Sequence, residues 1–367
     1  METLEYNVKK IVNTHKHVDG GYFWDKYSAH PYVGCRHRCE FCYEIGTKYN
    51  PSKTPDEFGA TVKVKMNAPE LLRKELARLP KDILLTGDYQ PCEAKYKLSR
   101  QFLKICLEYE FPTLIVERSP LVLRDLDLLT EINKKSWTCV AFSMSCAASE
   151  GYRAVFEPHV PNVERRFEAM REIAAAGIPT GTVFIPILPF ISDRMENIEA
   201  IVRQTQENGG SFVIGGGLSL NNSQKERYMR LIAYHFPQQM ERYDNYFSAD
   251  EALSKKYFSV VGKRIRTYCN EYCISDRMHR YIPDNELAIN RKLAEKLFLS
   301  VYESELNCDN QYKVWAYRKA AWVVDELPES IESIFRQKGN EGIAAIPGIG
   351  KSVASKVSAI LTELMEQ

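Results

Sequence analysis

The sequence predicts an α/β fold, a partial, TIM-like (β/α)6 barrel followed by a small all-α domain. Two observations support this prediction. Short apolar runs rich in β-formers alternate with segments of helical periodicity between about residues 29 and 250. This alternation implies parallel strands joined by helices that cover the sheet. From residue 311 onward the pattern is helical, with one break at IPGIG.

Six strands and five helices account for the predicted barrel. The strands are expected at 29–33, 82–86, 112–117, 138–144, 179–188 and 211–214. The helices are expected at 68–79, 98–110, 124–134, 163–176 and 195–208. Because the carboxyl ends of parallel strands meet at one edge of a barrel, the active site should lie there.

The length of 367 residues predicts a large core plus an appended domain, since single cores stop growing near ~250–300 residues. We expect an N-terminal lead at 1–28, the barrel at 29–250, a basic helical and irregular extension at 251–310, and the small helical domain at 311–367. Nine Lys or Arg residues stand against four Asp or Glu residues between 255 and 292, with aromatic residues interleaved. This stretch either binds the phosphates and stacks on the bases of a nucleic acid, or it is an ordinary solvent-exposed face.

The composition argues against a membrane or secreted protein. The N-terminus lacks a basic lead into an apolar run, and the longest apolar stretch, 183–191, contains two prolines. Ten cysteines without an export signal are better interpreted as reduced thiols and metal ligands than as disulfides. We therefore expect a cytoplasmic monomer.

The strongest local pattern is PYVGCRHRCEFCYE, in which Cys35, Cys39 and Cys42 form C-x3-C-x2-C. Three thiolates this close can hold one [4Fe–4S] cluster while leaving one iron free. The amino and carboxylate groups of S-adenosylmethionine can chelate that iron and bring the sulfonium beside the cluster. The alternatives are a structural zinc site, with His37 as the nearest fourth ligand, or a chance run of cysteines.

The same motif, with Phe41 as the aromatic residue before the third cysteine, resembles the signature of the radical S-adenosylmethionine (SAM) superfamily. More narrowly, the chain is similar to the spore photoproduct lyase-like group of radical DNA repair photolyases. The similarity covers about 29–221 through PYVGCRHRCEFCY, TGDYQPCE, VERSPLVLRDLDLL and EPHVPNVERRFEAMREIAAAGIPTG. It implies the partial barrel, a [4Fe–4S] cluster and S-adenosylmethionine.

The resemblance also implies positions for the cofactor. Asp88, after a glycine that allows close approach, would face the ammonium group, and Arg118 would face the carboxylate. A tight turn and a surface salt bridge are the alternative interpretations of these two positions. Glu157 and Arg165 are either further contacts or a structural ion pair. The full set of expected cofactor contacts is Phe41, Tyr43, Thr86, Gly87, Asp88, Arg118, Ser143, Ser145 and Ile187.

The expected hydrogen-atom donor departs from the family pattern. Spore photoproduct lyase carries a cysteine after its second strand, and alignment on Asp88 places Leu85 at that position. Cys92 and Cys146 are the candidate thiol donors, with Tyr89 as a further radical relay. Each of them is alternatively a buried structural residue.

The sequence AAIPGIGKSVASKVSAIL resembles a helix-hairpin-helix, a module that holds the DNA backbone without reading sequence. The glycines would allow N–H groups at the helix start to approach a phosphate. The expected contacts are Gly348, Gly350, Lys351, Ser352 and Lys356. The segment 345–352 also fits a loose phosphate-loop pattern, but a nucleotide-hydrolysing core would need a strand before that loop and a sheet after it.

These features predict an enzyme that cleaves S-adenosylmethionine to a 5′-deoxyadenosyl radical and repairs or modifies a damaged DNA base. The target base would be flipped or single-stranded. The partners would be DNA, with RNA left open, and an external electron donor such as a flavodoxin or ferredoxin. Two rivals remain: radical chemistry on RNA, a peptide or a small molecule, and a non-catalytic DNA-binding protein with a structural or redox cluster.

Overall fold

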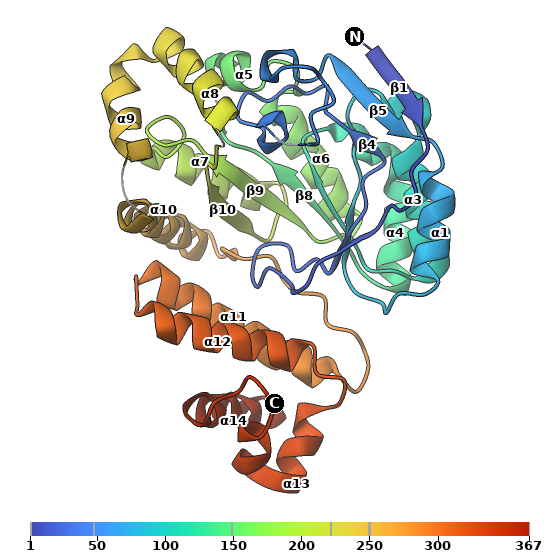
Figure 1. Ribbon diagram of the computed structural model, residues 1–367, viewed down its shortest axis with the longest axis vertical. Helices are drawn as coiled ribbons and strands as arrows, with labels where there is room; N and C mark the ends of the chain where they lie inside the picture. The colour runs from blue at the N-terminus through green and yellow to red at the C-terminus, as the bar shows by residue number, and fades with distance from the viewer. Residues whose placement is uncertain (1, 47, 148–149, 221, 249–250, 367) are drawn as a thin grey trace. The chain divides into compact units, whose positions relative to one another are not determined.

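The computed structural model describes residues 2–46, 48–147, 150–220, 222–248 and 251–366, and it divides into two compact units (Figure 1). The first unit consists of Met1–His15, Asp25–Ser254 and Arg264–Met278. The second unit consists of Lys16–Trp24, Lys255–Lys263 and His279–Gln367. The expected division into four segments remains a prediction.

The first unit is built on a seven-stranded sheet of order β10-β9-β8-β7-β6-β3-β2. Strands β3, β6, β7, β8, β9 and β10 run parallel to one another, and β2 pairs antiparallel with β3 at one edge of the sheet. This is the predicted partial barrel with six parallel strands. The strands are β2 (Asn13–Thr14), β3 (Tyr27–Ser28), β6 (Leu84–Thr86), β7 (Thr113–Glu117), β8 (Thr138–Ser143), β9 (Thr180–Ile187) and β10 (Val213–Gly217).

The helices cover the outside of this sheet because each buries one apolar face. All six residues of β8 are buried, as expected for a central strand covered on both sides. In one covering helix the buried residues Phe102, Leu103 and Cys106 recur at helical spacing. The covering helices are α1 (Ala68–Leu76), α3 (Leu98–Tyr109), α4 (Leu126–Lys135), α6 (Val163–Ala175) and α7 (Met195–Glu207).

A second, three-stranded sheet was not predicted. It consists of β1 (Glu2–Tyr6), β5 (Thr61–Lys65) and β4 (Tyr32–Val33), in the order β1-β5-β4. The single strand expected at 29–33 is therefore wrong. Its place in the barrel is taken by β3, whereas β4 pairs antiparallel with β5. Alternation in so short a run cannot tell which of two sheets a strand joins.

Further helices lie between or after the strands of the first unit, and the middle of one of them, α10, belongs to the second unit. Helix α8 lies beside the cysteine loop although it is far from it in the sequence, as its contacts with η1 and η2 show. Helix α9 packs against α8. The bounds are α2 (Glu93–Tyr96), α5 (Glu150–Phe156), α8 (Asn222–His235), α9 (Met240–Ser248), α10 (Glu251–Glu271), η1 (Tyr43–Gly46), η2 (Pro55–Glu57), η3 (Pro120–Asp125) and η4 (Pro237–Gln239).

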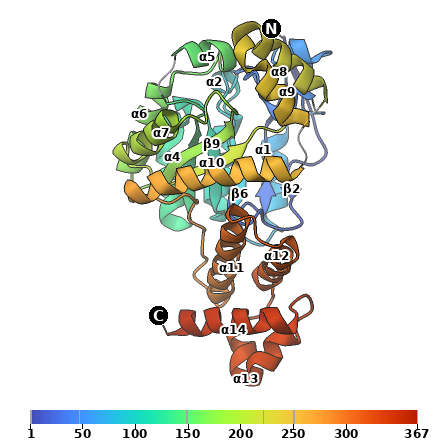
Figure 2. The same cartoon turned by 90° about the vertical axis from the view of Figure 1, so that its left-hand side faces the viewer.

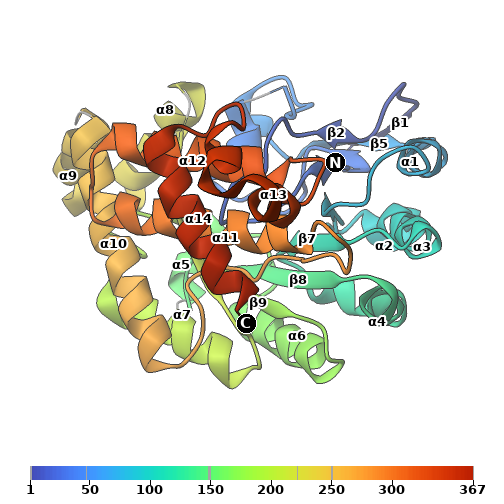
Figure 3. The ribbon, with the colours of Figure 1, turned by 90° about the horizontal axis from the view of Figure 1, so that it is seen from below.

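The second unit is helical, as predicted. Helices α11 (Ala288–Leu306) and α12 (Gln311–Asp325) pack along each other, and α13 (Ile331–Ala344) and α14 (Lys351–Met365) pack against them (Figures 2 and 3). The segment before the 345–352 loop is a helix, so the strand that a phosphate loop requires is absent from this described part of the chain. Among the described residues, every helix is too short or too polar to span a lipid bilayer.

Candidate functional site

The three motif cysteines lie on one loop that follows β4. Cys39 is buried, and Cys35 and Cys42 are half-buried. The loop begins at Gly34, whose φ is +80°. A Cβ atom there would lie 2.7 Å from Pro51 Cδ and 2.9 Å from the Thr61 carbonyl oxygen. Only glycine therefore lets this loop leave the small sheet in this direction.

The Gln90 side chain ties the cysteine loop to the end of β6. Its Oε1 accepts a hydrogen bond of 3.1 Å from the Arg36 N–H. Its Nε2 donates to the Gly34 carbonyl at 2.9 Å and to Asp88 Oδ1 at 3.2 Å. Gln90 is 1% exposed, so water cannot replace these bonds. Sequence analysis did not single out Gln90, although it lies within TGDYQPCE.

Helix α8 holds the opposite side of the same loop. The Gln224 Nε2 atom donates to the carbonyls of Phe41 at 3.0 Å and Cys42 at 2.6 Å. One turn further along, Arg227 forms an ion pair with Glu40. These contacts span more than 180 positions in the sequence, so no local pattern could have indicated them.

The three thiols affect one another's pKa, but they do not converge on a single metal-binding point. Burial raises the pKa of Cys35 and of Cys42 well above the ordinary value, and Cys39 adds to both shifts. Buried thiols of this kind ionise only when positive charge compensates them, as a metal does. Among the residues that the structure describes, no group of three His, Cys, Asp or Glu side chains is close enough to hold a single metal ion.

Acidic side chains gather at the ends of β6 and β7. Burial raises the pKa of Asp88 well above its ordinary value, and Glu117 and Glu44 raise it further. Glu117 is also buried, and it accepts backbone hydrogen bonds from Tyr89 at 2.7 Å and Arg118 at 2.9 Å. Gly87, with φ +88°, makes the turn that leads to Asp88. A ligand that brings a cation, such as an ammonium group, would favour the ionised form of these buried carboxyls.

The cationic side of the site is a buried triad of Arg118, Glu157 and Arg166. Glu157 accepts from Arg118 Nη1 at 2.6 Å and from Arg166 Nη2 at 2.5 Å. Arg118 also donates to the Ile185 carbonyl at 3.1 Å and lies over the Phe41 ring at 5.2 Å. Arg118 thus bridges the cysteine loop, β7 and β9.

The expected ion pair of Glu157 with Arg165 is wrong by one residue. Arg165 is exposed, whereas Arg166 is fully buried on the inner face of α6 beside Phe167. Arg166 Nη1 also donates to the Ser143 carbonyl at 2.9 Å. The helical periodicity of α6, with Met170 and Ile173 on the same buried face, was the signal that favoured position 166.

The remaining predicted cofactor contacts are buried at the strand ends, except Tyr43. The Ser143 hydroxyl donates to the Ile185 carbonyl at 3.2 Å. The Thr86 hydroxyl donates to the Ala29 carbonyl at 2.7 Å. Ser145 and Ile187 are buried at the ends of β8 and β9. Tyr43 is 64% exposed, so its ring extends toward solvent.

The three candidate radical residues have different surroundings. Cys92 is buried in an apolar cluster with Tyr32, Val62 and Leu98, and burial raises its pKa to about 12. Tyr89 is fully buried, and its hydroxyl donates to Asp125 at 3.1 Å. Cys146 is half-buried and packs against the cluster that contains Cys39 and Phe41.

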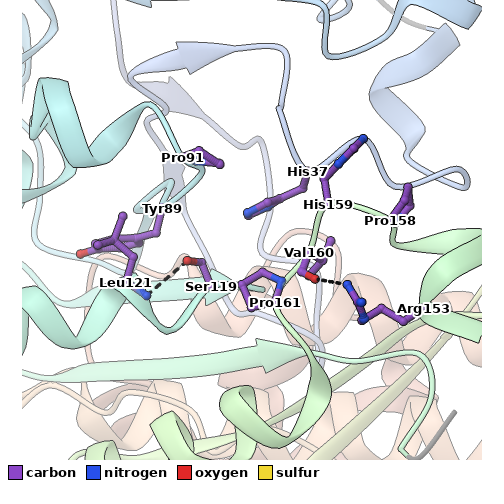
Figure 4. A pocket seen from close by; sticks show the side chains of 10 residues that line it. All are labelled: His37, Tyr89, Pro91, Ser119, Leu121, Arg153, Pro158, His159, Val160 and Pro161. Carbon is purple, nitrogen blue, oxygen red and sulfur yellow. Dashed lines mark hydrogen bonds between the residues drawn. The ribbon is translucent and has the colours of Figure 1, made fainter. Parts of the chain in front are cut away.

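A cavity of about 340 Å³ opens beside the cysteine loop (Figure 4). It is bounded by the cysteine loop through His37, by the segments after β6 and β7 through Tyr89 and Ser119, and by α5 through Arg153. Burial, together with the charges of Arg118 and Arg166, lowers the pKa of His37 to about 4. His37 is therefore neutral at physiological pH.

The predicted hairpin residues lie together in the second unit. Gly348 has φ +96°, and Gly350 is the N-cap of α14. Lys351, Ser352 and Lys356 are exposed on the first turns of α14, whereas Val353 and Val357 are buried. The start of α14 thus presents N–H groups and two lysines to solvent.

Both parts of the chain match known protein families. Residues 30–204 match the Radical SAM superfamily, and residues 290–364 match a helix-hairpin-helix domain. An uncharacterized protein of Mycobacterium tuberculosis is 26% identical over 72% of this chain and 79% of its own length. An uncharacterized protein of Methanocaldococcus jannaschii is 26% identical over 72% of this chain and 94% of its own length.

The fold is similar to that of spore photoproduct lyase. One solved structure, a mutant of that enzyme, superposes with a TM-score of 0.51 at 16% identity, over 74% of this chain and 78% of the other. Another, complexed with dinucleoside spore photoproduct, superposes with a TM-score of 0.50 at 16% identity, over 74% and 79% of the chains. At this identity the likeness concerns the fold.

We predict that Gln90→Leu opens the cysteine loop. The Arg36 N–H and the Gly34 carbonyl would lose a buried partner, and each loss costs about 1–3 kcal/mol. A cost of about 1.4 kcal/mol raises the population of an opened loop tenfold. Alkylation of Cys35, followed by mass spectrometry of the anaerobic protein, should therefore accelerate about tenfold. Gln206→Leu, at an exposed position of α7, is the matched control. An unchanged alkylation rate in the Gln90 variant would contradict the clamp.

We also predict that the stability of the first unit depends on pH through Glu157. Burial acts to raise the pKa of Glu157, but Arg166 and Arg118 outweigh it and hold this pKa below its ordinary value of 4.5. The triad therefore stabilises the fold above pH 4.5, and this contribution disappears as the pH falls through the depressed value.

Glu157→Gln should reduce the free energy of unfolding at pH 7 by about 3–5 kcal/mol, because Arg118 and Arg166 lose their charged partner. In urea titrations this loss appears as a lower unfolding midpoint. The variant should also flatten the acid limb of the stability profile. Glu164→Gln, on the exposed face of the same helix, should change neither property. A Glu157 variant with the wild-type acid limb would refute this assignment.

Proposed function

We propose that this protein is a radical SAM enzyme acting on damaged DNA, because residues 30–204 match the Radical SAM superfamily and residues 290–364 match a helix-hairpin-helix domain. The observation that carries the proposal is the loop of Cys35, Cys39 and Cys42, fixed against the ends of the parallel strands by Gln90 and Gln224. When bound there, a [4Fe–4S] cluster would supply the electron that cleaves S-adenosylmethionine to a 5′-deoxyadenosyl radical.

The chain's own residues would position the cofactor. Asp88 supplies the negative charge that an ammonium group needs, and Gly87 gives close backbone access beside it. Arg118 is tied to Glu157 and lies over Phe41, so it would orient the loop and bring positive charge toward a carboxylate. Thr86, Ser143, Ser145 and Ile187 would shape the floor beneath the adenosine, and Tyr43 would cover it from the solvent side.

Among the candidate hydrogen-atom donors, we favour Cys146. Its thiol is half-buried and packs beside the cysteine loop, so a substrate could reach it. Cys92 is buried among apolar side chains, and Tyr89 is fully buried with its hydroxyl bonded to Asp125. These two residues would instead support the loop after β6.

The helix-hairpin-helix domain favours DNA as the molecule that contains the target base. N–H groups at the start of α14, with Lys351, Ser352 and Lys356, would bind backbone phosphates without reading sequence. A neighbour of the same fold was solved with dinucleoside spore photoproduct, a fragment of damaged DNA. Leu85 occupies the aligned donor position, so we propose a different lesion or a base modification. One-electron reduction would come from an external protein such as a flavodoxin or ferredoxin.

We predict that the anaerobically reconstituted protein converts S-adenosylmethionine to 5′-deoxyadenosine when dithionite is added. Cys42→Ala removes one of the three thiolate ligands, so it should lose bound iron and essentially all cleavage. Chromatography of the nucleoside product and an iron assay measure the two effects. Cys273→Ala and Cys308→Ala, both at exposed positions, should retain iron and activity.

Product analysis of the same reaction with ultraviolet-irradiated DNA tests the substrate. Faster 5′-deoxyadenosine formation with irradiated than with intact DNA, and loss of a photoproduct, would support the proposal. A cluster that binds S-adenosylmethionine without cleaving it would favour a non-catalytic DNA-binding protein. Cleavage stimulated only by RNA or a peptide would point to the other rival.

We predict that the hairpin lysines contribute to DNA affinity through phosphate contacts. Each lysine lost should weaken binding about uniformly across sequences and reduce the slope of log affinity against log salt by about 1. Lys351→Ala combined with Lys356→Ala should thus reduce the slope by about 2, measured by fluorescence anisotropy. Lys104→Ala with Lys135→Ala removes two exposed lysines elsewhere and is the matched control. Equal slopes in both double variants would argue against the hairpin.

A further inference from the structure

Helix α12 carries an exposed row of aromatic and basic side chains opposite its buried face. The buried face contains Val314, Ala320, Ala321 and Val324, and it packs against the rest of the second unit. The opposite face contains Tyr312, Trp315, Lys319 and Trp322, which recur every three or four residues and therefore share one side of the helix. We call these four residues the α12 stripe.

The α12 stripe exposes large rings to solvent. Tyr312 is 89% exposed and Trp315 is 49% exposed. Clustered exposed aromatic residues are characteristic of binding surfaces, because their burial against a partner releases water.

The inner rings of the stripe are held in fixed orientations. The His17 ring stacks on Trp322 with 4.5 Å between centroids and 15° between planes. The Trp322 Nε1 atom donates to the Val18 carbonyl at 2.9 Å, and His17 Nδ1 contacts Glu326 at 3.0 Å. The ring centroid of Trp315 lies 6.2 Å from that of Trp322. A partner ring would find a platform that is already ordered, so little conformational entropy would be lost on binding.

The charge along the stripe suits an anionic polymer. Residues 311–319 contain Lys313, Arg318 and Lys319 and lack Asp and Glu. The Arg318 guanidinium lies 5.4 Å from the Trp315 ring centre while pairing with Glu305 at 2.6 Å. Lys313 and Lys319 are exposed. Near the end of the stripe, Glu326 is bonded to His17, and Asp325 is paired with Arg280 and Arg291.

The stripe adjoins the hairpin that we propose for phosphate binding. A Cβ atom on Gly348 would lie 2.8 Å from Val323 Cγ2, so the hairpin turn packs directly on α12 beside Trp322. Lys319 lies one turn before Val323 on the same helix. A strand whose backbone lies on the hairpin would therefore reach the aromatic rings within the same unit.

We propose that the α12 stripe stacks the unpaired bases of single-stranded DNA next to the segment held by the hairpin. This inference rests on the proposed DNA function and makes it more specific. Aromatic rings flanked by cations stack bases of any sequence, which suits an enzyme that must find a damaged base in varied contexts. The stripe thus distinguishes unpaired from paired DNA, whereas the hairpin binds both.

The experiment compares two strands on the full-length protein. One is an oligothymidylate of roughly 12 nucleotides, and the other has the same length and charge but abasic sites in place of the bases. Wild type should bind the strand with bases about tenfold more tightly or better, measured by fluorescence anisotropy. Trp315→Ala should remove most of this difference and leave the affinity for the abasic strand unchanged.

Two further variants complete the design. Trp315→Phe keeps a ring and should retain most of the preference for bases, which separates stacking from damage to the fold. Tyr234→Ala, which removes an 82% exposed tyrosine from α8, should behave as wild type.

Equal wild-type affinity for the two strands, with binding intact, would overturn the stacking role and leave the hairpin assignment standing. Absence of binding to either strand would overturn the DNA function itself. A Trp315→Ala protein that keeps the full preference for bases would show that the exposed rings serve another partner.

Discussion

A buried amide holds the candidate site together. The Gln90 side chain has no access to water, so its oxygen and nitrogen must find partners within the protein. These partners lie both on the cysteine loop and just after β6, so the Gln90 side chain connects the two segments. The loop is also held from the other side by Gln224 of α8 and by the ion pair of Arg227 with Glu40. These contacts together place the three thiols beside the ends of the parallel strands.

The distribution of buried charge explains what the site can accept. On one side Asp88 and Glu117 share a region of low polarity, and burial raises the pKa of each carboxyl. On the other side Arg118 and Arg166 converge on Glu157 and keep it ionised. A zwitterionic ligand, with an ammonium group and a carboxylate, would complement this separation. Burial keeps His37 neutral by lowering its pKa, and the neighbouring arginines oppose its protonation further.

The second unit adds a surface whose chemistry differs from that of the barrel. Its net charge is balanced over 311–367, with seven basic and seven acidic residues, so overall electrostatics do not make it a nucleic-acid binder. The folded chain separates the charges locally: the hairpin exposes Lys351 and Lys356, and α12 exposes lysines between aromatic rings. Affinity for DNA would thus arise from a few placed groups, with backbone contacts at one place and ring contacts at another.

The sequence by itself determined the alternation of strands and helices, the barrel class, the cysteine motif and the hairpin, because each depends on residues that are close in the chain. Hydrophobic periodicity placed β7, β8 and α6 within a few residues of their bounds. The motif cysteines were predicted from their spacing, whereas the turn at Gly87 and Asp88 and the hairpin before Gly350 were predicted from resemblance to known families.

Only the tertiary structure decided which sheet Tyr32–Val33 joins, which arginine pairs with Glu157, and which side chains hold the cysteine loop. These features depend on partners far away in the sequence, and the local pattern is the same whether the partner is present or absent. The α12 stripe has the same origin. Its aromatic residues fit a buried helix equally well in sequence, and their exposure follows from the face that α12 turns toward its neighbours in the fold.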